Sequence, residues 1–280
     1  MAHNNIKESN AKVGHNFHLV NPSPWPIATS FSLLILAIGG ILFMHKYMIG
    51  HFVLPLGLLL VISTVYCWWK DVVTEGIRDK AHSEIVQQGL RIGMALFILS
   101  EIMFFYAFFF SYFKASFDPV NILEPGEVWA IKEGIWPPAG IEKFDPWDIP
   151  FMNTLILLLS GTTVTWAHHA LIENNKKDLI QALTYTVILG VFFSCMQAIE
   201  YMHSPFLFKD GVYASNFYMA TGFHGAHVLI GTIFLLVCLI RAKKGDFDKG
   251  KGHLALEFAA WYWHFVDVVW LFLYIFVYIF

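Results

Sequence analysis

The chain has 280 residues and a net charge of −3; 57% of its residues are hydrophobic and only 14% are charged. A water-soluble domain averages about a quarter charged residues, so this composition excludes an ordinary soluble domain and indicates an integral membrane protein. The nearly balanced charge gives no indication of nucleic-acid binding.

Apolar stretches of about 20 residues are long enough to cross a bilayer as helices. The chain contains seven of them, so the sequence predicts an all-α integral membrane fold with seven transmembrane helices. The predicted spans lie at 27–45, 52–69, 89–113, 149–171, 179–203, 213–240 and 255–280.

The segments between the spans predict how the chain is divided. Dense mixed charge at 73–88 predicts a connecting loop between a two-helix arm at 27–72 and a five-helix bundle at 89–280. Residues 1–26 form an N-terminal segment before the first span. The stretch 114–148 is long and acidic and contains Pro and Trp, which predicts an extended external loop.

The distribution of Lys and Arg predicts the orientation in the membrane. Thirteen of the 18 lie in the N-terminal segment and in the second, fourth and sixth loops. Because positive charge accumulates on the cytoplasmic side, we expect a cytoplasmic N-terminus and a C-terminus outside. The polar first 15 residues show no cleaved signal peptide or targeting signal. This favours a bacterial inner (plasma) membrane, with the mitochondrial inner membrane as the alternative.

Four carboxyl groups fall within apolar stretches, where a charge is costly unless the group is neutral or paired. They are Glu101, Glu200, Glu257 and Asp267. For Glu101 the sequence leaves open an interhelical hydrogen bond that fixes packing and a role in a proton pathway. For Asp267 the structural role is favoured, since His264 lies one turn earlier and can share its helix face.

Histidines in or near the spans raise the possibility of haem, because membrane haem proteins use them as axial ligands. His168 and His169 are neighbours at a helix end and point about 100° apart. His224 and His227 are three residues apart and share a face. That spacing leaves open one metal site, although buried, hydrogen-bonded imidazoles are favoured. No recurring carboxylate–histidine motif indicates a di-metal bundle.

Aromatic and small residues predict how the helices meet the membrane and one another. Tryptophans near predicted span ends or in the third loop predict an interfacial belt; they are Trp68, Trp69, Trp129, Trp136, Trp147, Trp166, Trp261 and Trp263. On the cytoplasmic side, Trp69, Lys70, Arg91 and Arg241 supply the basic and aromatic groups typical of a lipid head-group pocket. Close helix packing is predicted at the glycines of the sixth span, Gly222, Gly225 and Gly231.

Several strings of residues resemble subunit III of cytochrome c oxidase, and the similarity runs over nearly the whole chain. The longest are Thr221-Gly-Phe-His-Gly-Ala-His-Val228 and Trp261-Tyr-Trp-His-Phe-Val-Asp-Val-Val-Trp-Leu-Phe-Leu-Tyr274. Shorter ones include Asn21-Pro-Ser-Pro-Trp-Pro26, Trp68-Trp-Lys-Asp-Val72 and Thr165-Trp-Ala-His-His169.

The resemblance implies a V-shaped arrangement, with helices one and two on one arm, helices three to seven on the other, and phospholipids in the cleft. It also implies a non-redox accessory subunit that binds no haem or copper, since these belong to partner subunits. Such a subunit packs directly against subunit I, in a complex that also contains subunit II and small subunits. It is expected to support oxygen access and proton uptake in that proton-pumping oxidase.

The resemblance further implies roles for particular residues. Glu101 matches the family's buried carboxyl that reacts with carbodiimide reagents. We expect it to be protonated at pH 7 and hydrogen-bonded, with His224 or His227 as the candidate partner. Positions that contact lipid head groups in relatives are matched by Trp69, Glu75, His82 and Arg241. The structural polar residues are expected to be Asp71, His224, His227, His264 and Asp267.

Two alternatives to an accessory subunit remain to be weighed. One is a membrane oxidoreductase whose haem is held by histidines, but the candidate ligands lack paired geometry. The other is an autonomous proton or ion carrier built on Glu101, Glu200 and Asp267, but the sequence shows neither an inverted repeat nor a pair of broken spans. The resemblance selects the accessory subunit, with no catalytic or metal-ligating residue of its own.

Overall fold

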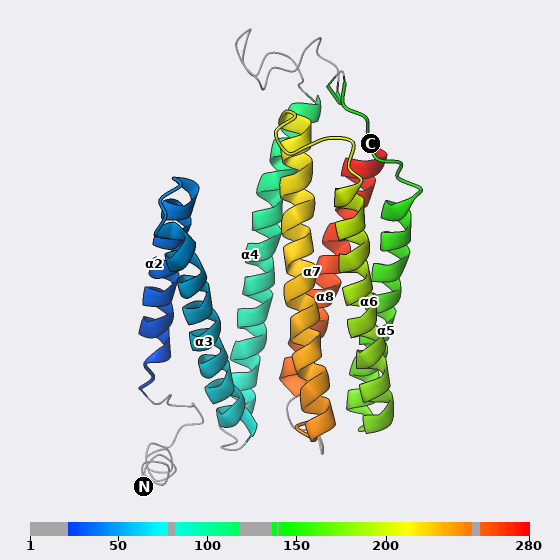
Figure 1. Cartoon of the computed structure of the whole chain (residues 1–280). Coiled ribbons are helices and arrows are strands. Elements are labelled where there is room, and N and C mark those ends of the chain that lie inside the picture. Colours follow the sequence, from blue (N-terminus) through cyan, green and yellow to red (C-terminus); the bar gives the residue numbers. More distant parts are fainter. Residues whose placement is uncertain (1–21, 78–81, 118–135, 139, 248–252) are drawn as a thin grey trace. The chain divides into compact units, whose positions relative to one another are not determined.

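The computed structural model describes residues 22–77, 82–117, 136–138, 140–247 and 253–280. Within these ranges every regular element is helical, and seven helices are long and apolar enough to span a membrane (Figure 1). The seven predicted spans are therefore confirmed, whereas the orientation of the termini stays a prediction. The N-terminal segment up to residue 21, Trp129 and most of the predicted external loop lie outside the described residues.

The chain divides into two compact units, and the division falls after Leu90. The first unit contains α2 (Trp25–Met44), α3 (Gly50–Ile77) and the first residues of α4 (Glu84–Phe117). Much of the segment 73–88 is helical rather than the predicted loop, because α3 runs on to Ile77 and α4 already begins at Glu84. Hydropathy marks only the part of a helix in hydrocarbon, and backbone hydrogen bonding continues past it.

Glycines allow α2 and α3 to pack backbone against backbone. A β-carbon added at Gly39 would lie 2.6 Å from the backbone nitrogen of Leu54. One added at Gly57 would lie 2.6 Å from the Cα atom of Leu36. Without a hydrophobic driving force between helices in lipid, such close approach supplies much of the attraction that joins them.

Gly39 and its neighbour Gly40 provide a matched test of this packing. We expect Gly39→Ala to destabilise the α2–α3 hairpin by about 1–3 kcal/mol, since the methyl group meets backbone that cannot move aside. Gly40→Ala meets no atom within 4 Å and is expected to leave the hairpin unchanged or slightly more stable. Amide hydrogen exchange across α2 and α3 in the purified complex measures the difference. Equal exchange in the two variants would contradict the packing argument.

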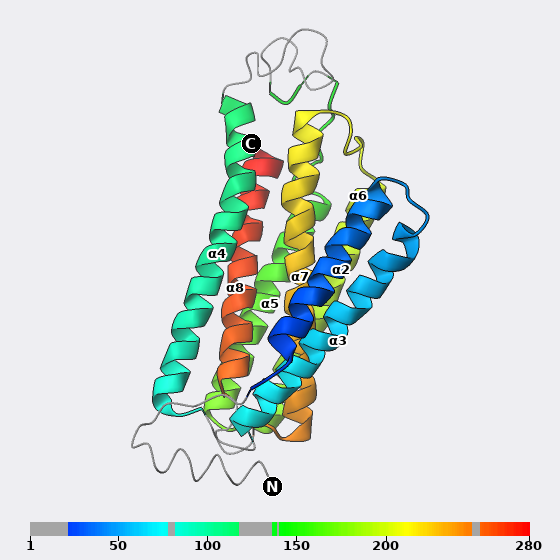
Figure 2. The ribbon, with the colours of Figure 1, turned by 90° about the vertical axis from the view of Figure 1, so that its left-hand side faces the viewer.

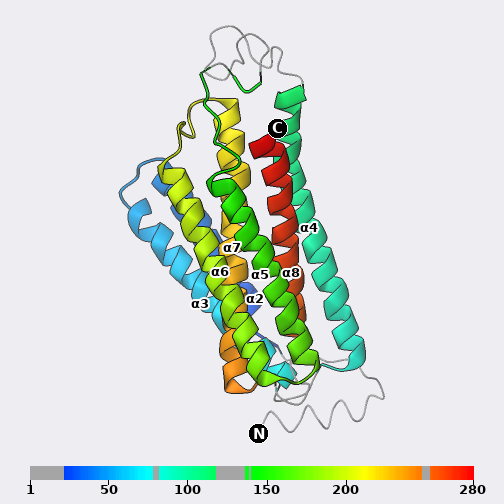
Figure 3. The same ribbon diagram turned by 90° about the vertical axis from the view of Figure 1, so that its right-hand side faces the viewer.

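The second unit contains the rest of α4 and four further helices. These are α5 (Ile149–Ile172), α6 (Lys176–Met202), α7 (Val212–Lys244) and α8 (His253–Leu273), which continues as the π-helix η3 (Tyr274–Ile279). Figures 2 and 3 show α8 running along the bundle between α4 and α5. The last span, α8 with η3, is the most buried of the seven, so it forms the centre of the core.

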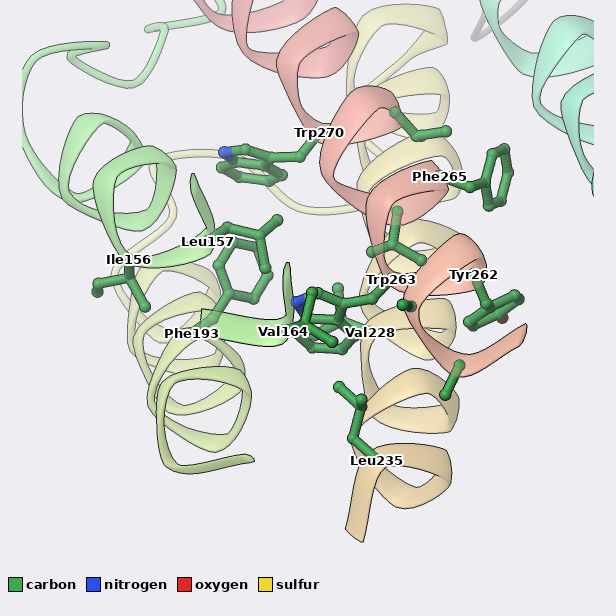
Figure 4. Close-up of a cluster of buried hydrophobic side chains, with 14 of the residues drawn as sticks. Ile156, Leu157, Val164, Phe193, Val228, Leu235, Tyr262, Trp263, Phe265 and Trp270 are labelled. Carbon is green, nitrogen blue, oxygen red and sulfur yellow. The ribbon is translucent and has the colours of Figure 1, made fainter. Parts of the chain in front are cut away.

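The core is organised around Trp263 of α8, which is fully buried. Its indole ring packs against two glycines, which leave room for it: a β-carbon at Gly190 of α6 or at Gly231 of α7 would lie 2.8 Å from the ring. The indole nitrogen donates a hydrogen bond of 2.9 Å to Ser160 Oγ of α5. Figure 4 shows Trp263 and Trp270 pointing from α8 into the buried cluster.

This placement corrects one prediction and refines another. Trp263 belongs to the core and not to an interfacial belt, because glycines and a hydroxyl group on three other helices accommodate its ring and its N–H group. Gly231 is a close-packing position as predicted. Gly225 is not, since no atom lies within 4 Å of a β-carbon built there.

Candidate functional site

The central polar contact of the second unit joins Glu101 of α4 to His227 of α7. Glu101 Oε2 lies 2.7 Å from His227 Nε2, and both side chains are mostly buried. Of the two partners considered for Glu101, the structure pairs it with His227. The other ring nitrogen, Nδ1, lies 2.6 Å from the carbonyl oxygen of Phe223, one turn earlier on α7.

These two contacts limit where protons can be. A carbonyl oxygen only accepts, so His227 Nδ1 must carry a proton and donate it to Phe223. The Glu101–His227 contact then holds one further proton, either on the carboxyl group or on Nε2. The pair has no net charge in either case, which is the state that a low-polarity environment favours.

The environment of this pair is aromatic. The ring centroid of Phe105 lies 4.9 Å from that of His227, and that of Phe104 lies 5.8 Å away. The Tyr262 ring stacks on the imidazole at 6.4 Å. Rings from α4 and α8 therefore shield the polar contact from lipid and water.

His224 does not join His227 in a common site, although the two share a helix face. Its Nε2 donates to the carbonyl oxygen of Val266 of α8 at 3.2 Å, and its ring packs against Phe193 and Trp270. Each imidazole thus binds a different helix. The described residues contain no group of three or more His, Cys, Asp or Glu that could hold a metal ion.

His264 and Asp267 are neighbours on α8, as their spacing predicts, but they do not satisfy each other completely. His264 Nδ1 lies 3.7 Å from Asp267 Oδ2, longer than a hydrogen bond, and its Nε2 contacts Thr165 Oγ1 at 3.2 Å. Asp267 Oδ1 is buried and has no hydrogen-bond partner among the described residues. Oδ2 occupies the space that Gly161 leaves open on α5, since a β-carbon there would clash with it.

Glu257 is paired with a residue that sequence reasoning assigned only to topology and a possible lipid pocket. Arg91 of α4 binds it through two parallel hydrogen bonds, Nε to Oε1 at 2.8 Å and Nη2 to Oε2 at 3.0 Å. This bidentate geometry is the strongest form of an Arg–carboxylate contact. Arg91 and Glu257 carry opposite charges, and each lies two residues after the start of a predicted span. These matching positions could have indicated the pair.

Glu200 lies near the C-terminal end of α6, and the sequence did not predict its partners either. Its Oε1 accepts hydrogen bonds from the Tyr278 hydroxyl at 2.6 Å and from Gln197 Nε2 at 3.2 Å. The carboxyl group therefore bonds one residue of its own helix, α6, and one residue of η3. Glu200 and Tyr278 are 78 residues apart in the sequence.

In the first unit the predicted lipid residues lie towards the end of α3. Trp69 is 65% exposed. Gly76 lies two turns further on the same face, and a β-carbon there would lie 2.9 Å from His82 Nδ1. Glu75 is half-buried beside them. Trp69 and His82 thus share one face of this unit.

Asp71 accepts a hydrogen bond that links the two helices of the first unit. The indole nitrogen of Trp25 donates to Asp71 Oδ2 at 2.5 Å. Because Trp25 is the first residue of α2 and Asp71 lies near the end of α3, this bond joins the open ends of the hairpin.

Arg241, the remaining predicted lipid residue, lies in the last turn of α7. Gly245 ends this helix with a φ of 82°, in the left-handed region that glycine adopts readily. The chain therefore folds back on Arg241, placing Asp246 Oδ2 3.3 Å from its Nε and the Phe247 ring 5.1 Å from its guanidinium carbon. Its side chain is only 13% exposed.

Comparison with known proteins agrees with the resemblance noted in the sequence. Residues 15–280 match the family model described as cytochrome c oxidase subunit III. The chain is 65% identical to "Probable cytochrome c oxidase subunit 3" of Rickettsia bellii, over 95% of this chain and 96% of the relative. It is 52% identical to "Cytochrome c oxidase subunit 3" of Prototheca wickerhamii, over 94% and 97%, and 50% identical to that of Arabidopsis thaliana, over 94% and 96%.

Proposed function

Because the chain belongs to the cytochrome c oxidase subunit III family, we propose that it binds phospholipids, packs against subunit I and supports oxygen access and proton uptake there. Family membership makes it an accessory subunit of a multi-subunit oxidase of the respiratory chain, and no catalytic site in this subunit is indicated. Electron transfer from cytochrome c to oxygen then takes place on haem and copper in partner subunits.

The seven apolar helices and the family make the protein a multi-pass protein of a respiratory membrane. Its similarity to Rickettsia proteins is higher than that to the plant and algal ones, which favours a bacterial inner membrane. The alternative remains a mitochondrial inner membrane.

Lipid head-group binding is supported by the chemistry of Trp69 and Arg241. An exposed indole near the end of a span is suited to the head-group region of a bilayer. Only Nε of Arg241 is bonded to Asp246 among the described residues, so the guanidinium retains further N–H donors for a phosphate group. His82 and Glu75 supply the further polar groups on α3 and beyond it.

Oxygen access follows from the solubility of oxygen in an apolar medium. Ordered lipid chains held by these head-group contacts would form a low-polarity path along which oxygen concentrates near subunit I. The exposed apolar side chains of the spans are suited to such chains, since they offer few polar groups to a lipid. Packing over subunit I would shelter a proton entrance and keep its uptake fast.

Replacement of both Trp69 and Arg241 by alanine tests the lipid role. We expect the variant oxidase to retain less phospholipid after purification and to lose activity earlier during continuous turnover. Trp147→Ala is the control, because Trp147 is similarly exposed and lies at the end of the predicted external loop 114–148. Unchanged lipid content together with unchanged durability in turnover would refute the proposal.

A further inference from the structure

A second polar cluster lies in the core, and the proposed function does not involve any of its residues. Its centre is the carboxyl group of Glu200, which is 1% exposed. Oε1 accepts the two hydrogen bonds from Tyr278 and Gln197 described above. Oε2 is buried and has no partner among the described residues.

The nearby amides are also incompletely bonded. Asn153 of α5 is fully buried, and neither its Nδ2 nor its Oδ1 has a hydrogen-bond partner in the described part of the chain. Gln197 Oε1 is buried without one as well. An unpaired buried polar group costs about 1–3 kcal/mol, and nearly all such groups in folded proteins are bonded to the protein or to ordered water.

The antiparallel helices α5 and α6 bring these groups to the same depth. The Thr163 and Thr186 hydroxyl groups lie 2.8 Å apart and fix the register of the two helices. At a rise of about 1.5 Å per residue, Asn153 lies about 15 Å from this contact along α5. Gln197 lies about 16 Å from it in the same direction along α6.

Helical periodicity also places the side chains on facing surfaces. Gln197 is three turns from Thr186, so it faces α5 as Thr186 does. Asn153 is two turns from Ser160, which faces the core and bonds Trp263. Gln197 is likewise two turns from Gly190, which lies against the same Trp263 ring. Glu200 is one turn beyond Gln197 and bonds it, so all three polar side chains face the space among α5, α6 and α8 at a similar depth.

The π-helix closes the cluster from the side of α8. Over Tyr274–Ile279 the helix widens, and Tyr274, Val277 and Tyr278 are all buried. Tyr278 reaches Glu200, while the Tyr274 hydroxyl donates to the carbonyl oxygen of Pro146 at 3.2 Å. Wide turns of this kind occur frequently at functional sites because they redirect side chains.

We propose that Asn153, Gln197 and Glu200 form a buried binding site for ordered water within the second unit. The unpaired atoms include a donor, Asn153 Nδ2, and three oxygen atoms. A water molecule both donates and accepts hydrogen bonds, so it can bond the unpaired donor as well as the unpaired oxygen atoms. A metal cation would leave the amide N–H groups unpaired. An anion would leave the three unpaired oxygen atoms without donors.

A structure of the intact oxidase at a resolution that shows ordered water provides the first test. We expect a density peak about 3 Å from the Asn153 amide, Gln197 Oε1 and Glu200 Oε2. Direct bonding of Asn153 to Gln197 or Glu200, with no peak, would overturn the proposal. A peak coordinated at about 2.3–2.6 Å would replace water by a cation and would overturn it too.

Infrared spectroscopy of the same complex provides a second test in solution. The carboxyl band of Glu200 is identified by its loss in Glu200→Gln. We expect Asn153→Leu, which removes one side of the site, to move this band to higher wavenumber and to slow its response to D2O. Asn216→Leu is the control, because the Asn216 amide donates within its own helix, to the carbonyl oxygen of Val212, and has no other hydrogen bond recorded in the described part of the chain. An unmoved band in a folded Asn153→Leu complex would count against bound water.

Discussion

Replacement of Trp263 by alanine is expected to destabilise the second unit by about 3–5 kcal/mol, the range measured when a large buried aromatic side chain is deleted. The ring lies against Gly190 and Gly231, which have no side chains that could close the resulting cavity. Ser160 Oγ would also lose the indole N–H group that donates to it. Three neighbouring helices would therefore lose contacts with α8 through one substitution.

The measurement is the temperature at which the subunit leaves the purified oxidase, with the amount that remains bound after detergent extraction. Trp261→Ala is the matched control, because Trp261 is two residues away on the same helix but only half-buried. We expect the control to behave nearly as the unaltered protein does. Similar losses in both variants would show that Trp263 is not the centre of the core.

Hydropathy is sufficient to predict the seven helices, because a bilayer requires about 20 apolar residues and satisfies no backbone polar group. The pairing of Glu101 with a histidine was also within reach of the sequence. Both residues lie about halfway along their predicted spans, and a polar group at that depth needs a partner. The choice of His227 over His224 depended on the rotation of α7, which no local pattern encodes.

Other contacts depend on packing between distant segments and were not predictable in this way. Arg91 and Glu257 are separated by 166 residues. Trp263 resembles an interfacial tryptophan until Gly190 and Gly231 are placed beside it. The partner of Glu200, Tyr278, comes from a π-helical turn whose residues look like an ordinary apolar span. In each case the deciding information is which faces of two helices meet.

Removal of either side of the Glu101–His227 contact is expected to destabilise the second unit. Glu101→Leu leaves His227 Nε2 without its partner, and His227→Leu leaves the carboxyl group alone. Each change should cost about 1–3 kcal/mol, because a mostly buried polar group becomes unpaired. The double variant should cost less than the sum of the two. Hydrogen bonds between membrane helices give coupling energies of about 0.6 kcal/mol on average and up to about 1.7 kcal/mol.

Glu101→Gln separates the two possible positions of the shared proton. If the carboxyl group holds it, His227 Nε2 is an acceptor, and the glutamine amide can donate to it in the same place. We therefore expect Glu101→Gln to keep nearly full stability and to remove a carboxylic acid band from the infrared spectrum at pH 7. If the proton resides on His227, the band lost would be that of a carboxylate, and the glutamine would replace an ion pair. In that case Glu101 would be charged inside the membrane, and our expectation of a neutral carboxyl group would be wrong.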